Sequence, residues 1–309
     1  MKKVLSLLFI SALSLIALEP IAPLPTTLED IDVPKAKLGR MLFLDPTLSS
    51  DQTISCHSCH DFEHGGADPR PVSLGVMGRK GDIQAPTVYN ARFNFKQFWN
   101  GRAENLSEQA KGPLTAHVEM DMSPQQIETS LNANPLYQEE FRSIYGIDHI
   151  TMVEAIDAIV EFEKALITPN SRFDRSLRGE IRLNEQEEQG YEKFKSLGCI
   201  TCHNGVNIGS NAYQKMGLFI EYPYNEKYQD RFTVTRQEKH KNVFKVPTLR
   251  NITNSAPYFH DANATTLEDA VTKMARYNLG IVLSEEYRDL IIAFLKTLEG
   301  ERPLILDQP

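Results

Sequence analysis

The chain has 309 residues and a formal net charge of −8 at pH 7, with a composition typical of a soluble globular protein. Its length allows one large domain or two of ordinary size. The acidic balance argues against nucleic acid as a partner, whereas it permits electrostatic steering of a basic protein partner.

The first segment has the pattern of an export signal. A short basic start, MKK, is followed by an apolar run over residues 4–18, which suits a signal-peptide core and is too short to span a bilayer comfortably. We therefore expect residues 1–18 to be a signal peptide that directs the protein to the periplasm. The cleavage site is poorly marked, because neither Ala17 nor Ala22 ends a clean A-x-A pattern. An uncleaved N-terminal anchor is the alternative.

Two short stretches hold all four cysteines. The first reads TISCHSCHDFEHGG over residues 53–66, and the second reads GCITCHNG over residues 198–205. In each, two cysteines are separated by two residues and followed at once by a histidine, which is the attachment pattern of c-type haem. Two thiols one helical turn apart can each bond a vinyl group of one porphyrin, and the next residue then lies beneath the ring. We predict two covalently bound haem c groups, with the thiols of Cys56, Cys59, Cys199 and Cys202 as attachment points and His60 and His203 as proximal iron ligands.

A zinc site of four thiolates and a pair of redox-active disulfides are the alternative uses of these cysteines. Neither explains why a histidine directly follows both pairs. Attachment of haem after export also agrees with the leader. His57 is expected to be a spacer inside the first motif, and His64 lies one turn further on.

The rest of the chain predicts helices joined by long loops. Residues 151–167 have an amphipathic pattern, and a helix is expected to begin at Asn184, with Glu187 as its capping partner, and to run to the second motif. Residues 267–298 predict two further helices, broken near Gly280. Strand-like alternation is sparse. The expected fold is therefore mostly α, with two cytochrome c-like haem domains and long loops.

Each haem is expected to have its own domain, because the two motifs lie far apart. We place the N-terminal domain at residues 19–170 and the C-terminal domain at residues 171–309. A c-haem with two strong axial ligands transfers electrons, whereas one with an open sixth position can act on a bound ligand. Met216 and Met274 are candidate sixth ligands of the second haem, although a lone methionine on a helix is more often a core residue.

Several stretches after the leader are long and specific: SCHSCH, GGADPRPVSLG, APTVYNARFNFKQFWNGRAENLSEQAKGPL, GCITCHNG, FKVPTLRNIT, APYFHDANATTLEDAV and IIAFLKTLEG. In these stretches, and so over nearly all of its length after the leader, the chain resembles the bacterial di-haem cytochrome c peroxidases. The resemblance implies two mostly helical c-haem domains, calcium at their interface and a homodimer. It implies that the N-terminal haem reduces hydrogen peroxide and that the C-terminal haem, ligated by His203 and Met274, receives electrons.

The resemblance also implies the working residues around the first haem. Glu119 corresponds to the acid/base carboxylate above the peroxidatic haem, and Gln109 corresponds to the amide that positions bound peroxide. Trp99 matches the tryptophan between the two haems and is the only tryptophan of the chain. Without the resemblance, these residues would be explained as a solvated surface acid, a helix-surface amide and a core aromatic.

A calcium site is implied in the same way. Its ligands would be the side-chain oxygen of Gln84 and the backbone carbonyls of Ser255 and Pro257, with waters completing the shell. Gln84 stands where the family usually has asparagine, so its amide oxygen reaches one methylene further. Oxygen ligands of this kind suit Ca²⁺.

One position departs from the family pattern. Many members carry a histidine after an S-x-G sequence, and this histidine blocks the peroxidatic iron of the oxidised enzyme until the other haem is reduced. Here residues 73–81 read SLGVMGRKG, and Val76, which cannot bind iron, stands at that position. We therefore expect a five-coordinate or water-bound site in the fully oxidised state. Met77, His64 or His117 as a substitute ligand is the alternative.

These residues and the resemblance together predict a periplasmic cytochrome c peroxidase that reduces hydrogen peroxide to water. The electron donor is expected to be a small soluble protein, either a monohaem cytochrome c or a cupredoxin. One alternative is a related di-haem oxidase that modifies a tryptophan of a partner protein, in which tyrosine replaces the methionine found here at Met274. The other is a di-haem cytochrome without turnover, in which Glu119 and Gln109 would have no purpose.

Overall fold

The computed structural model describes residues 19–307, so the predicted signal peptide lies outside the described residues. Within this range the fold is mostly helical, as predicted, and one two-stranded antiparallel sheet pairs β1 with β2. No helix in the range is long and apolar enough to cross a membrane. The elements are α1 (Val33–Leu44), α2 (Leu106–Thr115), α3 (Pro124–Asn132), α4 (Pro135–Tyr145), α5 (Met152–Ala165), α6 (Arg172–Leu177), α7 (Glu185–Ser196), β1 (Tyr213–Lys215), α8 (Arg231–Thr235), β2 (Val243–Lys245), α9 (Leu267–Met274) and α10 (Glu285–Lys296).

The helices predicted from sequence are confirmed, together with the predicted cap at Asn184. Thr151 caps α5, and Asn184 begins α7 with a reciprocal pair of hydrogen bonds to Glu187. These side chains satisfy N–H groups that have no partner in the first helical turn. The break near residue 280 is also present, because a π-helical turn at Ala275–Leu279 ends α9 and Ser284 caps α10.

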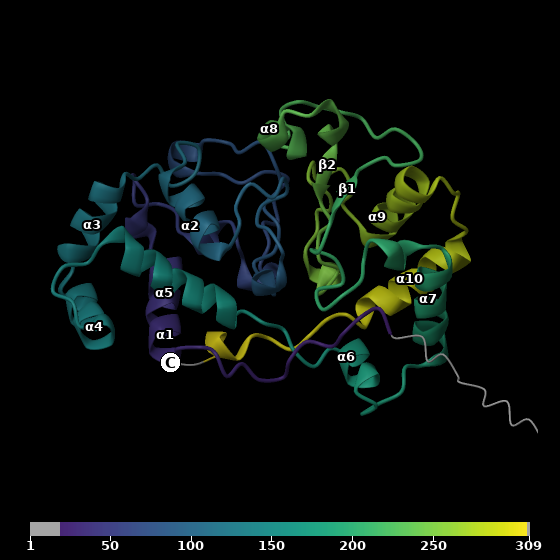
Figure 1. The fold of residues 1–309 in the computed structure, drawn as a ribbon, viewed down its shortest axis with the longest axis horizontal. Helices are drawn as coiled ribbons and strands as arrows, with labels where there is room; N and C mark the ends of the chain where they lie inside the picture. The colour runs from purple at the N-terminus through teal and green to yellow at the C-terminus, as the bar shows by residue number, and fades with distance from the viewer. Residues whose placement is uncertain (1–18, 308–309) are drawn as a thin grey trace, which may run out of the picture.

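Two helix pairs form two separate cores, at opposite ends of the molecule (Figure 1). In the first core α1 crosses α5, and in the second α7 crosses α10. Both crossings depend on a glycine. A Cβ at Gly39 of α1 would lie 1.9 Å from the carbonyl oxygen of Ala158, and a Cβ at Gly190 of α7 would lie 2.0 Å from that of Leu290. The two halves therefore use the same close helix packing, and each haem motif follows the first helix of its pair.

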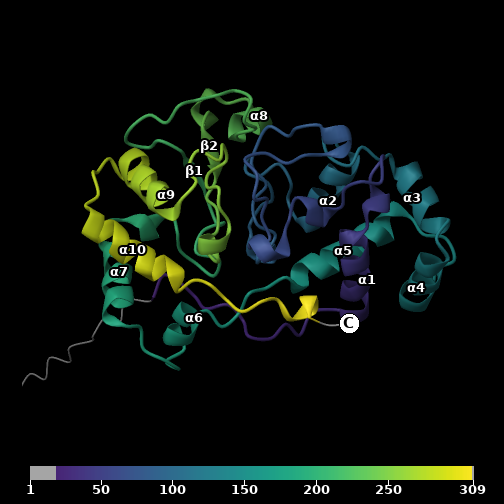
Figure 2. The same cartoon turned by 180° about the vertical axis from the view of Figure 1, so that it is seen from behind.

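Both ends of the described chain cross from one half to the other (Figure 2). At the start, Ile21 packs in the core of α7 and α10 before the chain reaches α1. At the end, Ile305 and Leu306 pack in the core of α1 and α5. Each half thus includes a segment from beyond the predicted division at residue 170. The limits of the two haem domains remain a prediction.

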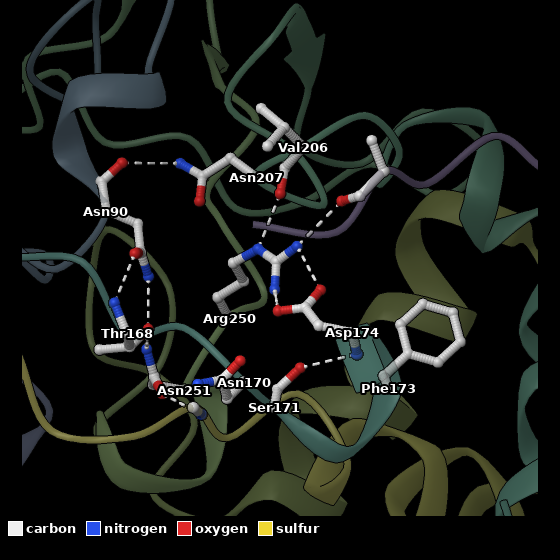
Figure 3. A network of polar contacts seen from close by, with 12 residues as sticks. Asn90, Thr168, Asn170, Ser171, Phe173, Asp174, Val206, Asn207, Arg250 and Asn251 are labelled. Carbon is white, nitrogen blue, oxygen red and sulfur yellow. Dashed lines mark hydrogen bonds and ion pairs between the residues drawn. The ribbon is translucent and has the colours of Figure 1, made fainter. Parts of the chain in front are cut away.

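A buried ion pair ties three segments together at the junction of the halves (Figure 3). The guanidinium of Arg250 donates to both carboxylate oxygens of Asp174, at 2.9 and 3.0 Å, and neither side chain is exposed. The same guanidinium donates to the backbone carbonyls of Val206 and Ala22. Such a bidentate pair is strong and directional. It fixes α6, the loop after His203 and the N-terminal segment relative to one another.

Buried amides continue this network across the junction (Figure 3). Asn90, from the first half, exchanges two hydrogen bonds with Thr168, at 2.8 and 3.0 Å. Asn251 donates to the hydroxyl of Thr168 at 2.7 Å, and Asn207 donates to the carbonyl of Asn90 at 3.3 Å. Because buried polar groups are costly to leave unpaired, this arrangement favours one relative placement of the halves.

The ion pair predicts a large effect of one substitution. Arg250→Met leaves the buried carboxylate of Asp174 without a partner, and we expect the free energy of unfolding to fall by about 3–5 kcal/mol. Denaturant-induced unfolding measures this loss. Arg142→Met is the control, because Arg142 pairs with Asp148 where the side chains are 61% and 84% exposed. It should cost less than about 1 kcal/mol, and equal losses in the two variants would contradict the expectation.

Candidate active site

Both C-x-x-C-H motifs fold into the same turn. Each begins with a 3₁₀ turn, after which the N–H of the histidine donates to the carbonyl of the first cysteine at 3.0 Å, from His60 to Cys56 and from His203 to Cys199. All four thiols are free. No three His, Cys, Asp or Glu side chains in residues 19–307 are grouped so that they could hold a metal ion. These arrangements argue against the disulfide and four-thiolate zinc alternatives.

The imidazoles of both motifs are suited to bind iron. Nδ1 of His60 lies 3.3 Å from the carbonyl oxygen of Gly66, so it can donate there and leave Nε2 for the metal. His203 is buried, and its Nδ1 has no hydrogen-bond partner among the described residues. Burial lowers the pKa of both rings, that of His203 to about 4. Each ring therefore stays in the neutral form that binds metals.

One continuous cavity of about 320 Å³ is lined by both His60 and His203. Near His203 its wall is apolar, with Phe194 of α7, Val271 of α9 and Leu295 of α10. A second cavity of about 100 Å³ is also lined by His203, together with Cys199 and Cys202. A mainly apolar cavity of about 320 Å³ is typical of ligand and cofactor sites. Free thiols, a neutral imidazole and an apolar wall fit a haem c at each motif.

α2 and the loop that follows it supply polar groups to the His60 end of the cavity. Gln109 lies on α2, and Glu119 lies shortly past its end; both are half-buried and line the cavity with His60. Burial raises the pKa of Glu119, and the nearby positive charge of Arg102 opposes this rise. The structure thus brings the predicted acid, amide and proximal ligand to one cavity.

The segment that contains Val76 is held against Glu119. Val76 is fully buried, and its N–H donates to the backbone carbonyl of Glu119 at 2.9 Å. Arg79 donates to the carbonyl of His117 at 2.7 Å and pairs with Asp121 at 2.7 Å. Several contacts therefore connect residues 73–81 to the backbone on both sides of Glu119.

The three alternative sixth ligands lie away from the cavity wall. Met77 is 69% exposed, and His117 is exposed beside Arg79. Nε2 of His64 contacts the carbonyl oxygen of Ala256, in the other half of the molecule. None of these three side chains lines the cavity that holds His60.

Trp99 lies between the two ends of the site and lines both cavities. Its ring makes edge contacts with Phe244 and His260, with centroids 6.3 and 6.2 Å apart. Its Nε1 donates to the backbone carbonyl of Gln84 at 2.8 Å. The indole is therefore fixed at the place where the two halves meet.

The predicted calcium ligands Gln84, Ser255 and Pro257 also line the main cavity. The side-chain amide of Gln84 is buried and donates to the carbonyl of Asp68 at 3.3 Å, while its backbone N–H donates to the carbonyl of His260 at 3.0 Å. The three residues thus border the same cavity. The calcium itself remains a prediction.

The two candidate methionines differ in which of the two cavities they line. Met274 ends α9 where the π-helical turn begins, and it lines both cavities. Met216 follows β1 and lines only the smaller one. Single π-helical turns within helices are frequent at functional sites. The choice between the two as an iron ligand remains a prediction, with Met274 better placed.

Comparison with known proteins identifies the family. Residues 33–182 match the family model described as di-haem cytochrome c peroxidase. A cytochrome c551 peroxidase of Nitrosomonas europaea is 44% identical over 301 residues, which cover 97% of this chain and 90% of the relative. The chain belongs to the di-haem cytochrome c peroxidase family. A cytochrome c551 peroxidase of Pseudomonas aeruginosa is 39% identical over 288 residues, which cover 90% of this chain and 82% of that relative.

The fold of this family member also matches a solved structure. The crystal structure of a MauG-like protein associated with microbial copper homeostasis superposes with a TM-score of 0.80 and 26% identity, over 94% of this chain and 95% of that chain. The resemblance seen in the sequence is thereby confirmed. As a di-haem family member with two C-x-x-C-H turns, the chain carries two haem c cofactors.

Two buried charged residues of the cavity wall were not predicted from the sequence. Glu163 of α5 is 4% exposed, its Oε2 has no hydrogen-bond partner among the described residues, and burial raises its pKa to about 8. Lys245 of β2 is 7% exposed and lines both cavities. A signal for Glu163 exists, because it shares the helical stripe of Ile156 and Ile159. For Lys245 the only signal is its place in the apolar run VFKVP.

Glu163 makes the stability of this peroxidase-family protein depend on pH. Its folded pKa of about 8 lies above the ordinary value of 4.5, so between these values the folded state binds more protons than the unfolded state. The free energy of unfolding therefore falls as the pH rises through this window. Since glutamine cannot ionise, Glu163→Gln should exceed the parent in stability by on the order of a few kcal/mol at about pH 8, and the difference should vanish near pH 4.5.

Unfolding curves of the holoprotein across this pH window measure the difference. Glu139→Gln is the control, because Glu139 is exposed on α4 and should leave the pH dependence of stability unchanged. Parallel pH profiles for the parent and Glu163→Gln would show that Glu163 does not ionise in this way.

Proposed function

We propose that this family member is a peroxidase that reduces hydrogen peroxide to water with electrons from a small soluble redox protein, either a monohaem cytochrome c or a cupredoxin. The observation that carries the proposal is the presence of Glu119 and Gln109 at the same cavity end as His60. A cytochrome that only transfers electrons has no use for an acid there. Two relatives named cytochrome c551 peroxidase support the same reaction.

The side chains around the peroxidatic site have different roles in the reaction. Cys56, Cys59 and His60 would hold the haem, which would supply the redox chemistry for splitting the O–O bond. Glu119 takes a proton from one peroxide oxygen and returns it to the other, which leaves as water. Its raised pKa brings this exchange closer to neutral pH. The amide of Gln109 holds the peroxide by hydrogen bonds while the proton moves.

The peroxidatic site is open in the fully oxidised state. Val76 occupies the position of the blocking histidine found in many family members and carries no group that binds iron. Val76 is buried and donates a hydrogen bond to the backbone of Glu119. These contacts support the proposal that residues 73–81 position Glu119 and do not move into the site. Peroxide then binds without prior reduction of the second haem.

His203 and Met274 of the C-terminal domain, residues 171–309, would hold the haem that receives electrons. Trp99 would lie on the path from that haem to the peroxidatic haem, which His60 of the N-terminal domain, residues 19–170, would hold. This path is supported by the single cavity that both imidazoles line, and by the contact of Trp99 with both cavities. An indole held between two redox centres divides the distance that an electron must cross into shorter steps.

The protein works in the periplasm as a homodimer with calcium between its haem domains. Export is supported by the apolar run of residues 4–18, which precedes the described residues. Calcium is supported by the fact that Gln84, Ser255 and Pro257 all line one cavity. The homodimer rests on the family resemblance alone.

The proposed acid/base role predicts the effect of Glu119→Gln. Glutamine has nearly the same shape but cannot carry the proton, so kcat for peroxide should fall by about 10²–10⁴-fold, whereas both haems should be retained. Steady-state turnover and the absorption spectrum measure these two properties. Glu139→Gln is the surface control and should keep the parent kcat. A Glu119→Gln protein within a fewfold of the parent would exclude Glu119 as the proton carrier.

The proposed second axial ligand predicts a difference between two methionine variants. Met274→Leu should abolish the long-wavelength absorption band of a methionine-ligated ferric haem and lower the midpoint potential of that haem, because methionine ligation raises it. Met216→Leu, at a buried position of the same site, should preserve both properties. The opposite pattern would assign the ligand to Met216. Absence of the band in the parent protein would exclude methionine ligation.

A further inference from the structure

Lys245 is a buried cation that faces the haem cavities without a carboxylate partner. It ends β2, is 7% exposed and lines both cavities. Its Nζ lies 3.5 Å from the hydroxyl of Ser210, at the far limit of a hydrogen bond. In residues 19–307 no carboxylate pairs with it, and burial is the only influence that moves its pKa, which falls to about 8.

Arg250, further along the same segment, shows how this fold treats a buried charge. Its side chain is completely buried, and Asp174 contacts its guanidinium through both carboxylate oxygens. A buried charge is strongly unfavourable unless it is paired in this way. Lys245 has no such partner in the described protein. We therefore infer that the anionic group that pairs with its ammonium belongs to the molecule bound in the cavity.

The smaller cavity identifies the occupant. Besides Lys245, it is lined by Cys199, Cys202, His203 and Met274, and by no residue of the first haem motif. The group that these residues hold is a haem c, and haem carries two propionate carboxylates. We propose that Lys245 is the counter-ion of a propionate of the second haem. This rests on the proposed haem site at His203 and does not depend on peroxide turnover.

The position of Lys245 gives this pairing a consequence for electron transfer. Its backbone N–H donates to the carbonyl of Trp99 at 2.7 Å, so a backbone hydrogen bond joins the residue that carries the charge to the residue that carries the indole. A positive charge beside the haem stabilises the reduced form, which carries one more electron. Lys245 therefore raises the midpoint potential of the second haem and positions that haem relative to Trp99.

The test compares three variants of the mature holoprotein. Lys245→Gln removes the charge and keeps most of the side-chain length, whereas Lys245→Arg keeps the charge and changes the shape. Lys239→Gln removes the same charge from an exposed position and is the control. The midpoint potential of the methionine-ligated haem is measured by spectroelectrochemical titration, and the haem content is measured in the same samples.

We expect Lys245→Gln to reduce the equilibrium constant for reduction of that haem by at least about tenfold, which is 59 mV for one electron. Lys245→Arg and Lys239→Gln should stay within about twofold of the parent by the same relation. A Lys245→Gln potential equal to that of Lys239→Gln would overturn the proposal. A drop in Lys245→Arg as large as that in Lys245→Gln would also overturn it, because the role would then be packing.

If Lys245→Gln does not retain the second haem, Lys245→Arg decides the question. If the positive charge at position 245 pairs with a propionate, Lys245→Arg should hold two haems per chain. It should also keep the midpoint potential of the parent and the parent resonance Raman band of propionate bending. A changed band or potential in Lys245→Arg would overturn the proposal. Peroxide turnover is recorded in parallel, so an inactive parent would reject the proposed function and still leave the potentials readable.

Discussion

The hydrogen bond from the histidine N–H to the carbonyl of the first cysteine closes each haem-attachment turn, and the position of each proximal imidazole depends on it. It brings His60 and His203 into the same relation to their two thiols. Each turn follows a helix that crosses its partner at a glycine, Gly39 in α1 and Gly190 in α7. Each imidazole also lies near an aromatic ring of that first helix, Phe43 or Phe194, with centroids 6.3 and 6.4 Å apart. The two redox sites thus share the same local structure.

What differs between the two halves gives each site its task. At the His60 end the cavity wall offers the carboxyl of Glu119 and the amide of Gln109, whereas at the His203 end it offers apolar side chains and Met274. A two-site enzyme also needs a constant separation between its sites. The chain ends that cross between the cores and the buried hydrogen bond from Asn207 to Asn90 provide this constraint. Trp99 occupies the place where the two tasks meet.

The features that could be predicted from sequence are those with a local pattern. The C-x-x-C-H spacing, the cap at Asn184 and the break near Gly280 each depend on neighbours a few residues away. The roles of Glu119 and Gln109 came from the family resemblance, because in sequence each is an ordinary polar residue. The crossing of the chain ends was not predicted, since Ile305 packs on helices more than a hundred residues away. The burial of Lys245 depends on the same long-range packing. The charge and the length of its side chain do not reveal from the sequence whether it is exposed.

The most direct test of an open peroxidatic haem is the low-temperature EPR spectrum of the fully oxidised holoprotein, recorded before and after addition of one equivalent of hydrogen peroxide. An open site predicts a high-spin ferric signal from the His60 haem that disappears when peroxide is added, with no reductant present. Two low-spin haems that ignore peroxide until one electron has been supplied would contradict it. In that case a side chain other than Val76 would fill the sixth position, and activation would require reduction of the second haem.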